Sequence, residues 1–108
     1  MQDINILTKL FNLVSYRDQL KNEMNKTKKS LVDTYYNKTF TNIYLKYKKE
    51  YNDVFYKIYG DEYYSILKNI FDLSENPQDI TAIGNQVLRA YKYKSGLIYF
   101  KIERLDHE

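Results

Sequence analysis

The residues that could perform acid–base chemistry are two local groups of acids, Asp61–Glu62 and the trio Asp72, Glu75 and Asp79. A general acid–base pair needs two carboxyl groups held apart across a cleft, with pKa values pushed in opposite directions. Here the acids fall where helices are predicted to begin, and the helix dipole stabilises a carboxylate at that position. Helix capping therefore explains these acids better than catalysis does.

The chain offers no other catalytic centre. It has no cysteine, and its one histidine, His107, stands next to the last residue. A thiol nucleophile, a zinc finger or a positioned imidazole is therefore not expected. The sequence also has neither a phosphate-binding glycine loop nor a Ser/His/Asp set. We expect a protein that is not an enzyme and that uses no cofactor and no metal.

A second chemistry is recognition of duplex DNA. Residues 62–72 and 77–93 could form a helix-turn-helix around a turn at 73–76, with 97–103 as part of a basic wing. The residues that would then contact DNA are Gln78, Thr81, Asn85, Arg89, Lys92, Lys94 and Lys101. Gln, Asn and Arg suit base edges, and Lys suits phosphates. The acids in and beside the turn argue against this arrangement, because they would lie near the phosphates that normally dominate affinity.

Single-stranded nucleic acid is a third possibility. Residues 91–94 and 99–101 interleave aromatic and basic side chains, as stacking platforms do. In an extended segment, however, the tyrosines and lysines of 91–94 would face opposite sides. We interpret these tyrosines as margins of the core and the lysines as solvated, because the helical period already explains the spacing.

The function that we favour is non-catalytic binding of a protein partner. Tyrosine accounts for 13 of the 108 residues, and several tyrosines fall on helix flanks that the predicted core does not cover. Tyrosine is common at interfaces because it buries a large area at a small cost in side-chain freedom. The predicted interface residues are Leu20, Met24, Leu45, Tyr56, Tyr59 and Tyr64. The alternative is that a small tyrosine-rich domain leaves some rings half exposed.

The totals indicate one domain over residues 1–108, with a net charge of +3 that permits nucleic acid without arguing for it. We expect no secretory signal and no membrane span, because no apolar run approaches the ~18 residues that a span needs. The predicted location is cytoplasmic. The bias toward Lys, Asn, Ile and Tyr is typical of an AT-rich genome. A phage or mobile-element protein that docks on a host or assembly component is the setting that we expect.

The elements that must position these residues are predicted to be helices, because three glycines and one proline are few breakers. The chain is organised around the stretch 40–60. At about 100° per residue, one face of this helix collects Phe40, Ile43, Tyr44, Tyr47, Tyr51, Val54, Phe55 and Ile58. Before it, apolar residues recur at helical spacing and favour one continuous helix over about 4–35.

The length of that first helix has a consequence. A helix of ~32 residues is roughly 48 Å long, whereas a compact domain of this size is only about 34 Å across. Either the fold is elongated, or the helix breaks, or Leu20 and Met24 contact a second copy of the chain. We favour the last alternative and predict a homodimer.

The remaining elements follow from local signals. Residues 34–39 should connect the first two helices, with Thr39 or Thr41 as the cap of the second and Gly60 as its left-handed end. A third helix is predicted over 62–72. Asn76 and Pro77 are typical of a helix start.

That start signal predicts a fourth helix from Gln78 to about Tyr93, with Gly84 at a close helix crossing. Residues 97–103 alternate as a strand does, and three pairings are open: a hairpin with 91–94, the connection at 35–40, or a second copy. The predicted fold is therefore all-α or mainly α, a long N-terminal helix plus three shorter helices in a bundle, with a short C-terminal strand or hairpin.

Overall fold

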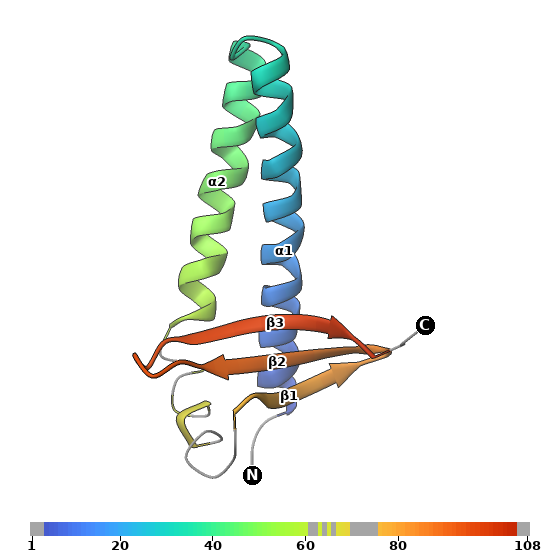
Figure 1. Ribbon diagram of the computed structural model, residues 1–108, viewed down its shortest axis with the longest axis vertical. Coiled ribbons are helices and arrows are strands. Elements are labelled where there is room, and N and C mark those ends of the chain that lie inside the picture. The colour runs from blue at the N-terminus through green and yellow to red at the C-terminus, as the bar shows by residue number, and fades with distance from the viewer. Residues whose placement is uncertain (1–3, 61–62, 64, 66, 70–75, 106–108) are drawn as a thin grey trace.

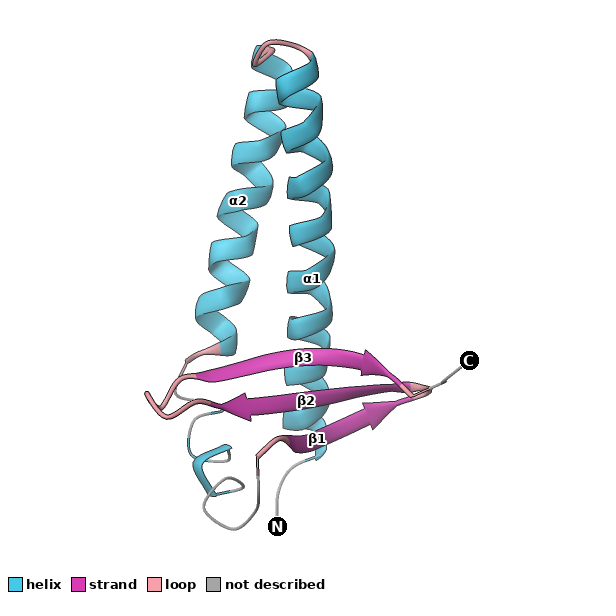
Figure 2. Cartoon of the chain, in the orientation of Figure 1, coloured by secondary structure: helices cyan, strands magenta, loops and turns pink. Residues whose placement is uncertain are grey.

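The computed structural model describes residues 4–60, 63, 65, 67–69 and 76–105. Two long helices form an antiparallel hairpin, and a three-stranded antiparallel sheet crosses the lower half of this hairpin (Figure 1). The helices are α1 (Ile4–Asp33) and α2 (Lys38–Ile58), and the strands are β1 (Gln78–Ile83), β2 (Gln86–Lys92) and β3 (Ile98–Arg104), in the order β1-β2-β3 (Figure 2). The fold is thus α+β, and the predicted bundle of four helices is wrong.

The helical hairpin confirms the two long helices that were predicted for the first half of the chain. α1 is one continuous helix, and α2 covers nearly all of the stretch 40–60. The molecule measures 51 × 37 × 28 Å and has a radius of gyration of 16.5 Å, against about 13 Å for a compact domain of this length. Elongation therefore accommodates the long helix within one chain. The length argument for a homodimer no longer holds, and the oligomeric state stays a prediction.

Neither long helix has a segment that is apolar enough to cross a bilayer, in the part of the chain that the structure describes.

The ends of α2 differ from their predicted form. Asn37, and not Thr39 or Thr41, caps the helix, because its side-chain oxygen accepts a hydrogen bond of 2.9 Å from the Thr39 amide. At the other end the helix closes at Tyr59, whose φ is −96°. The Tyr59 amide donates to the Phe55 carbonyl, and the Gly60 amide donates to the Lys57 carbonyl. Gly60 is not left-handed.

The predicted fourth helix is wrong, because β1 and β2 occupy its residues. The two strands are joined by Gly84 and Asn85, and Gly84 has the positive φ of 61° that tight hairpin turns favour at their first position. Asn76 does not cap a helix. Its side chain exchanges two hydrogen bonds with the backbone of Lys92, of 2.7 and 3.0 Å, and the Asn76–Pro77 peptide bond is cis.

The predicted helix 62–72 falls largely outside the described residues, although those that are described (63, 65 and 67–69) are helical. The predicted C-terminal strand is confirmed as β3, and its partner is β2, which places Tyr91 opposite Tyr99 and Lys92 opposite Ile98. Of the three open pairings, the hairpin is therefore the correct one.

The core lies between the sheet and the lower half of the hairpin. The inner face of the sheet presents Ile80, Leu88, Ala90 and Phe100, and the helices that it packs against present Leu10, Phe11, Val14, Val54 and Ile58. Toward the turn the core thins. There α1 buries Leu20, Thr27 and Leu31, while the facing tyrosines of α2 remain half exposed. The turn end of the hairpin therefore has little packing of its own.

Candidate interaction site at the hairpin tip

The turn between α1 and α2 places two tyrosines in a backbone conformation that tyrosine rarely adopts. Tyr35 has a φ of 56° and Tyr36 a φ of 61°. The Tyr36 amide donates to the Leu31 carbonyl (2.7 Å) and the Tyr35 amide to the Val32 carbonyl (3.4 Å). This pair of bonds is a Schellman motif, in which the left-handed residue after the helix is usually glycine. A side chain with a Cβ is strained there.

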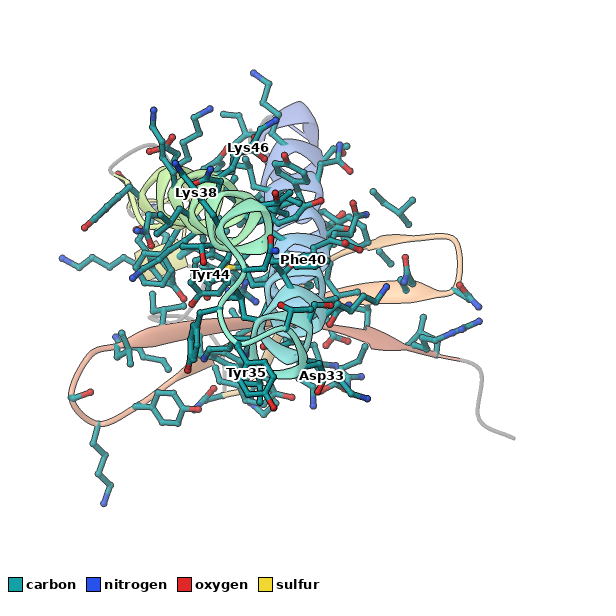
Figure 3. The ribbon with its side chains drawn as sticks, turned by 90° about the horizontal axis from the view of Figure 1, so that it is seen from above. Asp33, Tyr35, Lys38, Phe40, Tyr44 and Lys46 are labelled. Carbon is teal, nitrogen blue, oxygen red and sulfur yellow. The ribbon has the colours of Figure 1, made fainter. Side chains whose placement is uncertain are left out.

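Burial of the two rings does not offset this backbone strain. Tyr35 is 93% exposed and Tyr36 72% exposed. Figure 3 looks down on this end of the molecule and shows Tyr35 beside the connecting turn, next to Asp33. Two large rings therefore stand in solvent on a strained turn, and nothing in the described chain offsets the cost of that arrangement. Strained residues of this kind concentrate at functional sites.

A groove runs along the two helices below these tyrosines. Its volume is about 480 Å³, and its lining residues are Lys28, Lys29, Leu31, Val32, Tyr36, Thr41 and Tyr44. Most of this lining is apolar, and Val32 is 65% exposed within it. The Thr41 hydroxyl already donates to the Asn37 carbonyl at 3.1 Å. We call this groove, together with Tyr35, the hairpin tip.

The charge of the upper hairpin differs in sign from that of the remaining sequence. Residues 21–49 contain eight lysines and two acids, Glu23 and Asp33, which gives a net charge of +6. The whole chain carries 17 basic and 14 acidic residues. The residues outside 21–49 therefore include nine basic and twelve acidic side chains, and their net charge is −3. Lys26 forms an ion pair with Glu23, with 3.5 Å between Nζ and Oε1. Lys28 and Lys29 make no ion pair with any described residue.

The predicted interface residues do not form one surface. Leu20 is buried in the core, Met24 is half buried, and Tyr64 lies outside the described residues. Tyr59 packs between Phe55 and Phe100, with ring centroids at 4.7 and 5.7 Å, and burial raises the pKa of its hydroxyl.

Leu45 (53% exposed) and Tyr56 (74% exposed) remain open. Since they are eleven positions apart, which is close to three helical turns, they share one face of α2 about 16 Å apart.

The predicted DNA-contacting residues are distributed over the sheet and its turns. Gln78 and Thr81 lie on β1, Arg89 and Lys92 on β2, Lys101 on β3, and Asn85 and Lys94 in the two turns. The recognition helix of the predicted helix-turn-helix is therefore absent, because its residues form two strands.

Arg89 is also engaged within the protein. Its Nε donates to Asp79 at 2.8 Å, and its Nη1 donates to Glu103, on the outer face of the sheet. The Tyr91 hydroxyl donates to the same Glu103 at 2.8 Å. This hydrogen bond and the neighbouring guanidinium hold the pKa of Glu103 below its usual range. The network ties the three strands together and engages Nε and Nη1 of Arg89 within the protein.

Of the predicted acid groups, Asp61, Glu62, Asp72 and Glu75 lie outside the described residues. Asp79 is described, and it is paired with Arg89. Among the described residues, no three His, Cys, Asp or Glu side chains gather in a way that could hold a metal ion.

Sequence reasoning missed the hairpin tip as a site. Two adjacent tyrosines in a short helix–helix connection that contains no glycine were the available signal, since such a turn needs a left-handed residue. Compared with known proteins, the chain matches no family model, no curated protein and no solved structure.

Proposed function

We propose that this protein is a non-catalytic binding module and that the hairpin tip is the surface that contacts its protein partner. The observation that carries the proposal is Tyr35, a 93% exposed ring at a left-handed position that favours glycine. Glycine or asparagine would form this turn at lower cost. A tyrosine there is explained by what it contacts outside the chain.

The composition of the tip supports the same proposal. Interface hot spots are rich in tyrosine, and they are most effective beside a pocket from which a partner excludes water. The tip supplies both, since Tyr35 and Tyr36 stand next to an apolar groove. The exposed residues Leu45 and Tyr56 on α2 could extend the contact along the helix.

Photo-crosslinking in the cells from which the sequence comes would test the proposal. A benzophenone amino acid at position 35 should give one discrete protein adduct, and Tyr36→Ser should remove that adduct. The same probe at position 93, a 52% exposed tyrosine in the β2–β3 turn, is the matched control. If position 93 gives adducts and position 35 gives none, the tip is not the contact surface and the proposal is wrong.

Two other predictions remain open and are decided by separate measurements. Light scattering at high concentration tests the predicted homodimer. A mobility shift on duplex DNA over a salt series tests the alternative of a DNA-binding regulator, for which steep salt dependence is expected. That alternative has lost its recognition helix, and the lysines of the hairpin are what still favours it.

A further inference from the structure

We infer that the hairpin tip binds an acidic segment of its partner that carries an apolar side chain, with that side chain in the groove and carboxylates against Lys28 and Lys29. This inference rests on the proposed function and adds the chemistry of the partner. Three properties of the tip lead to it, namely the shape of the groove, the cations along it and the charge of the hairpin.

The groove has the size and lining of a side-chain pocket. At about 480 Å³ it falls in the range of ligand sites, about 300–1,000 Å³. Leu31, Val32 and Tyr44 give it an aliphatic and aromatic lining. A leucine or phenylalanine entering it would lose its contact with water and cover Val32, which is 65% exposed. The groove therefore fits an apolar side chain of the partner, which we call the apolar anchor.

The lysines at the groove favour a partner with negative charges around its apolar side chain. Lys28 and Lys29 line it, and within the described chain neither has a carboxylate partner. The surrounding residues 21–49 carry a net charge of +6. Opposite charges across an interface raise the association rate and exclude wrong partners, and like charges facing each other are unfavourable. The same charge argues against two tips of this chain meeting each other.

Two other anionic partners fit the groove less well. A membrane surface would meet the protruding Tyr35, but it would leave the concave groove beneath unfilled. A nucleic acid needs aromatic faces for stacking and cations for phosphates, whereas Leu31 and Val32 offer aliphatic surface. An acidic peptide with an apolar anchor uses all parts of the tip.

Fluorescence anisotropy on the full chain would test the inference. The probe is a labelled peptide of glutamates with leucine and phenylalanine at helical spacing. Its comparison probes have lysine for glutamate or serine for the apolar residues, and a labelled DNA duplex and phosphatidylglycerol vesicles are the other anionic arms. Only the acidic apolar peptide should bind, and raising the salt should weaken it.

Charge reversal at the groove supplies the decisive variant. The double substitution K28E and K29E should weaken binding of the acidic peptide by about tenfold or more, because two charge-assisted contacts are lost. K92E with K94E makes the same change in net charge at the sheet, away from the groove, and it should weaken binding of the peptide less than about threefold. Circular dichroism should show that both double variants keep their helix content.

The outcomes separate the inference from the proposed function. If a crosslink forms at position 35 but the acidic peptide does not bind, the partner chemistry is wrong while the protein-binding proposal stands. Equal weakening by the two double variants would mean unspecific attraction and would overturn the inference. Tip-dependent binding of the DNA duplex or the vesicles in place of the peptide would also overturn it.

Discussion

Arg17 on α1 donates a hydrogen bond of 2.8 Å from Nη2 to the backbone carbonyl of Phe100 on β3. In the β2–β3 ladder the Tyr93 amide bonds to the Leu97 carbonyl and the Leu105 amide to the Asn85 carbonyl. Since hydrogen-bonded pairs alternate in antiparallel strands, Phe100 turns its carbonyl away from β2 toward the free edge of the sheet. Arg17 therefore covers a buried carbonyl at an edge that would otherwise be open.

This contact predicts a large effect of Arg17→Met, which retains the stem and removes the donor. We expect the free energy of unfolding to fall by about 1–3 kcal/mol, because a buried carbonyl loses its partner. Urea unfolding followed by circular dichroism would measure the change. Lys21→Met, one turn further along α1 at an exposed position, is the control and should stay within about 0.5 kcal/mol. Equal effects of the two substitutions would contradict the role given to Arg17.

The outer face of the sheet predicts a dependence of stability on acid. The folded state holds the pKa of Glu103 below its usual range, through the Tyr91 hydroxyl and Arg89. A carboxyl group with a lowered folded pKa contributes stability above its unfolded pKa and loses it as the pH falls through the folded value. Glu103→Gln should therefore destabilise the protein near neutral pH, and the difference from the unchanged protein should shrink below the ordinary carboxyl range. Thermal melts between neutral and acid pH would show whether the two curves converge.

The strain at the hairpin tip predicts a substitution that improves folding and impairs binding. Tyr35→Asn should raise the free energy of unfolding by up to about 1 kcal/mol, because asparagine tolerates the left-handed conformation. Such a change corresponds to a rise of about 4–8 °C in Tm for a domain of this size. A benzophenone probe at Val32, which lines the groove, should lose its protein adduct in parallel. Tyr93→Asn, at an exposed tyrosine without a positive φ, should give neither change. A drop in Tm for Tyr35→Asn would mean that the ring stabilises the turn.

Two leucines at opposite extremes of burial test the packing of the core. Leu10 is fully buried against the sheet, and Leu45 is 53% exposed on α2. Leu10→Ala should cost about 2–5 kcal/mol through lost burial and the cavity that it leaves. Leu45→Ala should stay within about 0.5 kcal/mol. Denaturant midpoints for the two variants would check the order, and a large effect at Leu45 would place it under a neighbour, such as a second copy.

Helical periodicity was sufficient for the first half of the chain. The spacing of the apolar residues predicted α1 as one helix and α2 over almost its whole length, because each helix buries one face along its own axis. The strand at 97–103 was also predictable. Its alternation placed Phe100 and Lys101 on opposite faces, and the structure buries Phe100 and exposes Lys101.

The stretch 78–93 was wrongly predicted as a helix because the spacing of its apolar residues fits a helix as well as two short strands. Ile80, Ile83 and Val87 are three and four residues apart, which matches a helix, and Asn76–Pro77 resembles a helix start. The signal against a helix was Gly84–Asn85 between two short runs, a dipeptide typical of hairpin turns. The pairing of β1 and β2 with a distant β3 then decided the structure, and no local pattern reports that contact.

The hairpin tip was not predictable as a site for a related reason. Residues 34–39 were expected to connect the helices, and the structure has the connection at 34–37. The left-handed turn at Tyr35 follows from how α1 and α2 meet. In the sequence the lysines were apparent only as a net charge of +3. Their excess became a feature of one end only when the antiparallel hairpin brought Lys28 and Lys29 alongside α2.

The elongation of the hairpin has an electrostatic consequence. The 21 residues of α2 span about 31 Å, whereas mobile ions at physiological salt damp a surface charge within about 8 Å. At physiological salt the lysines around the turn are therefore screened from the charges of the sheet at the opposite end. A molecule that approaches the turn meets a local positive charge that is stronger than the sequence pI of about 8.9 indicates.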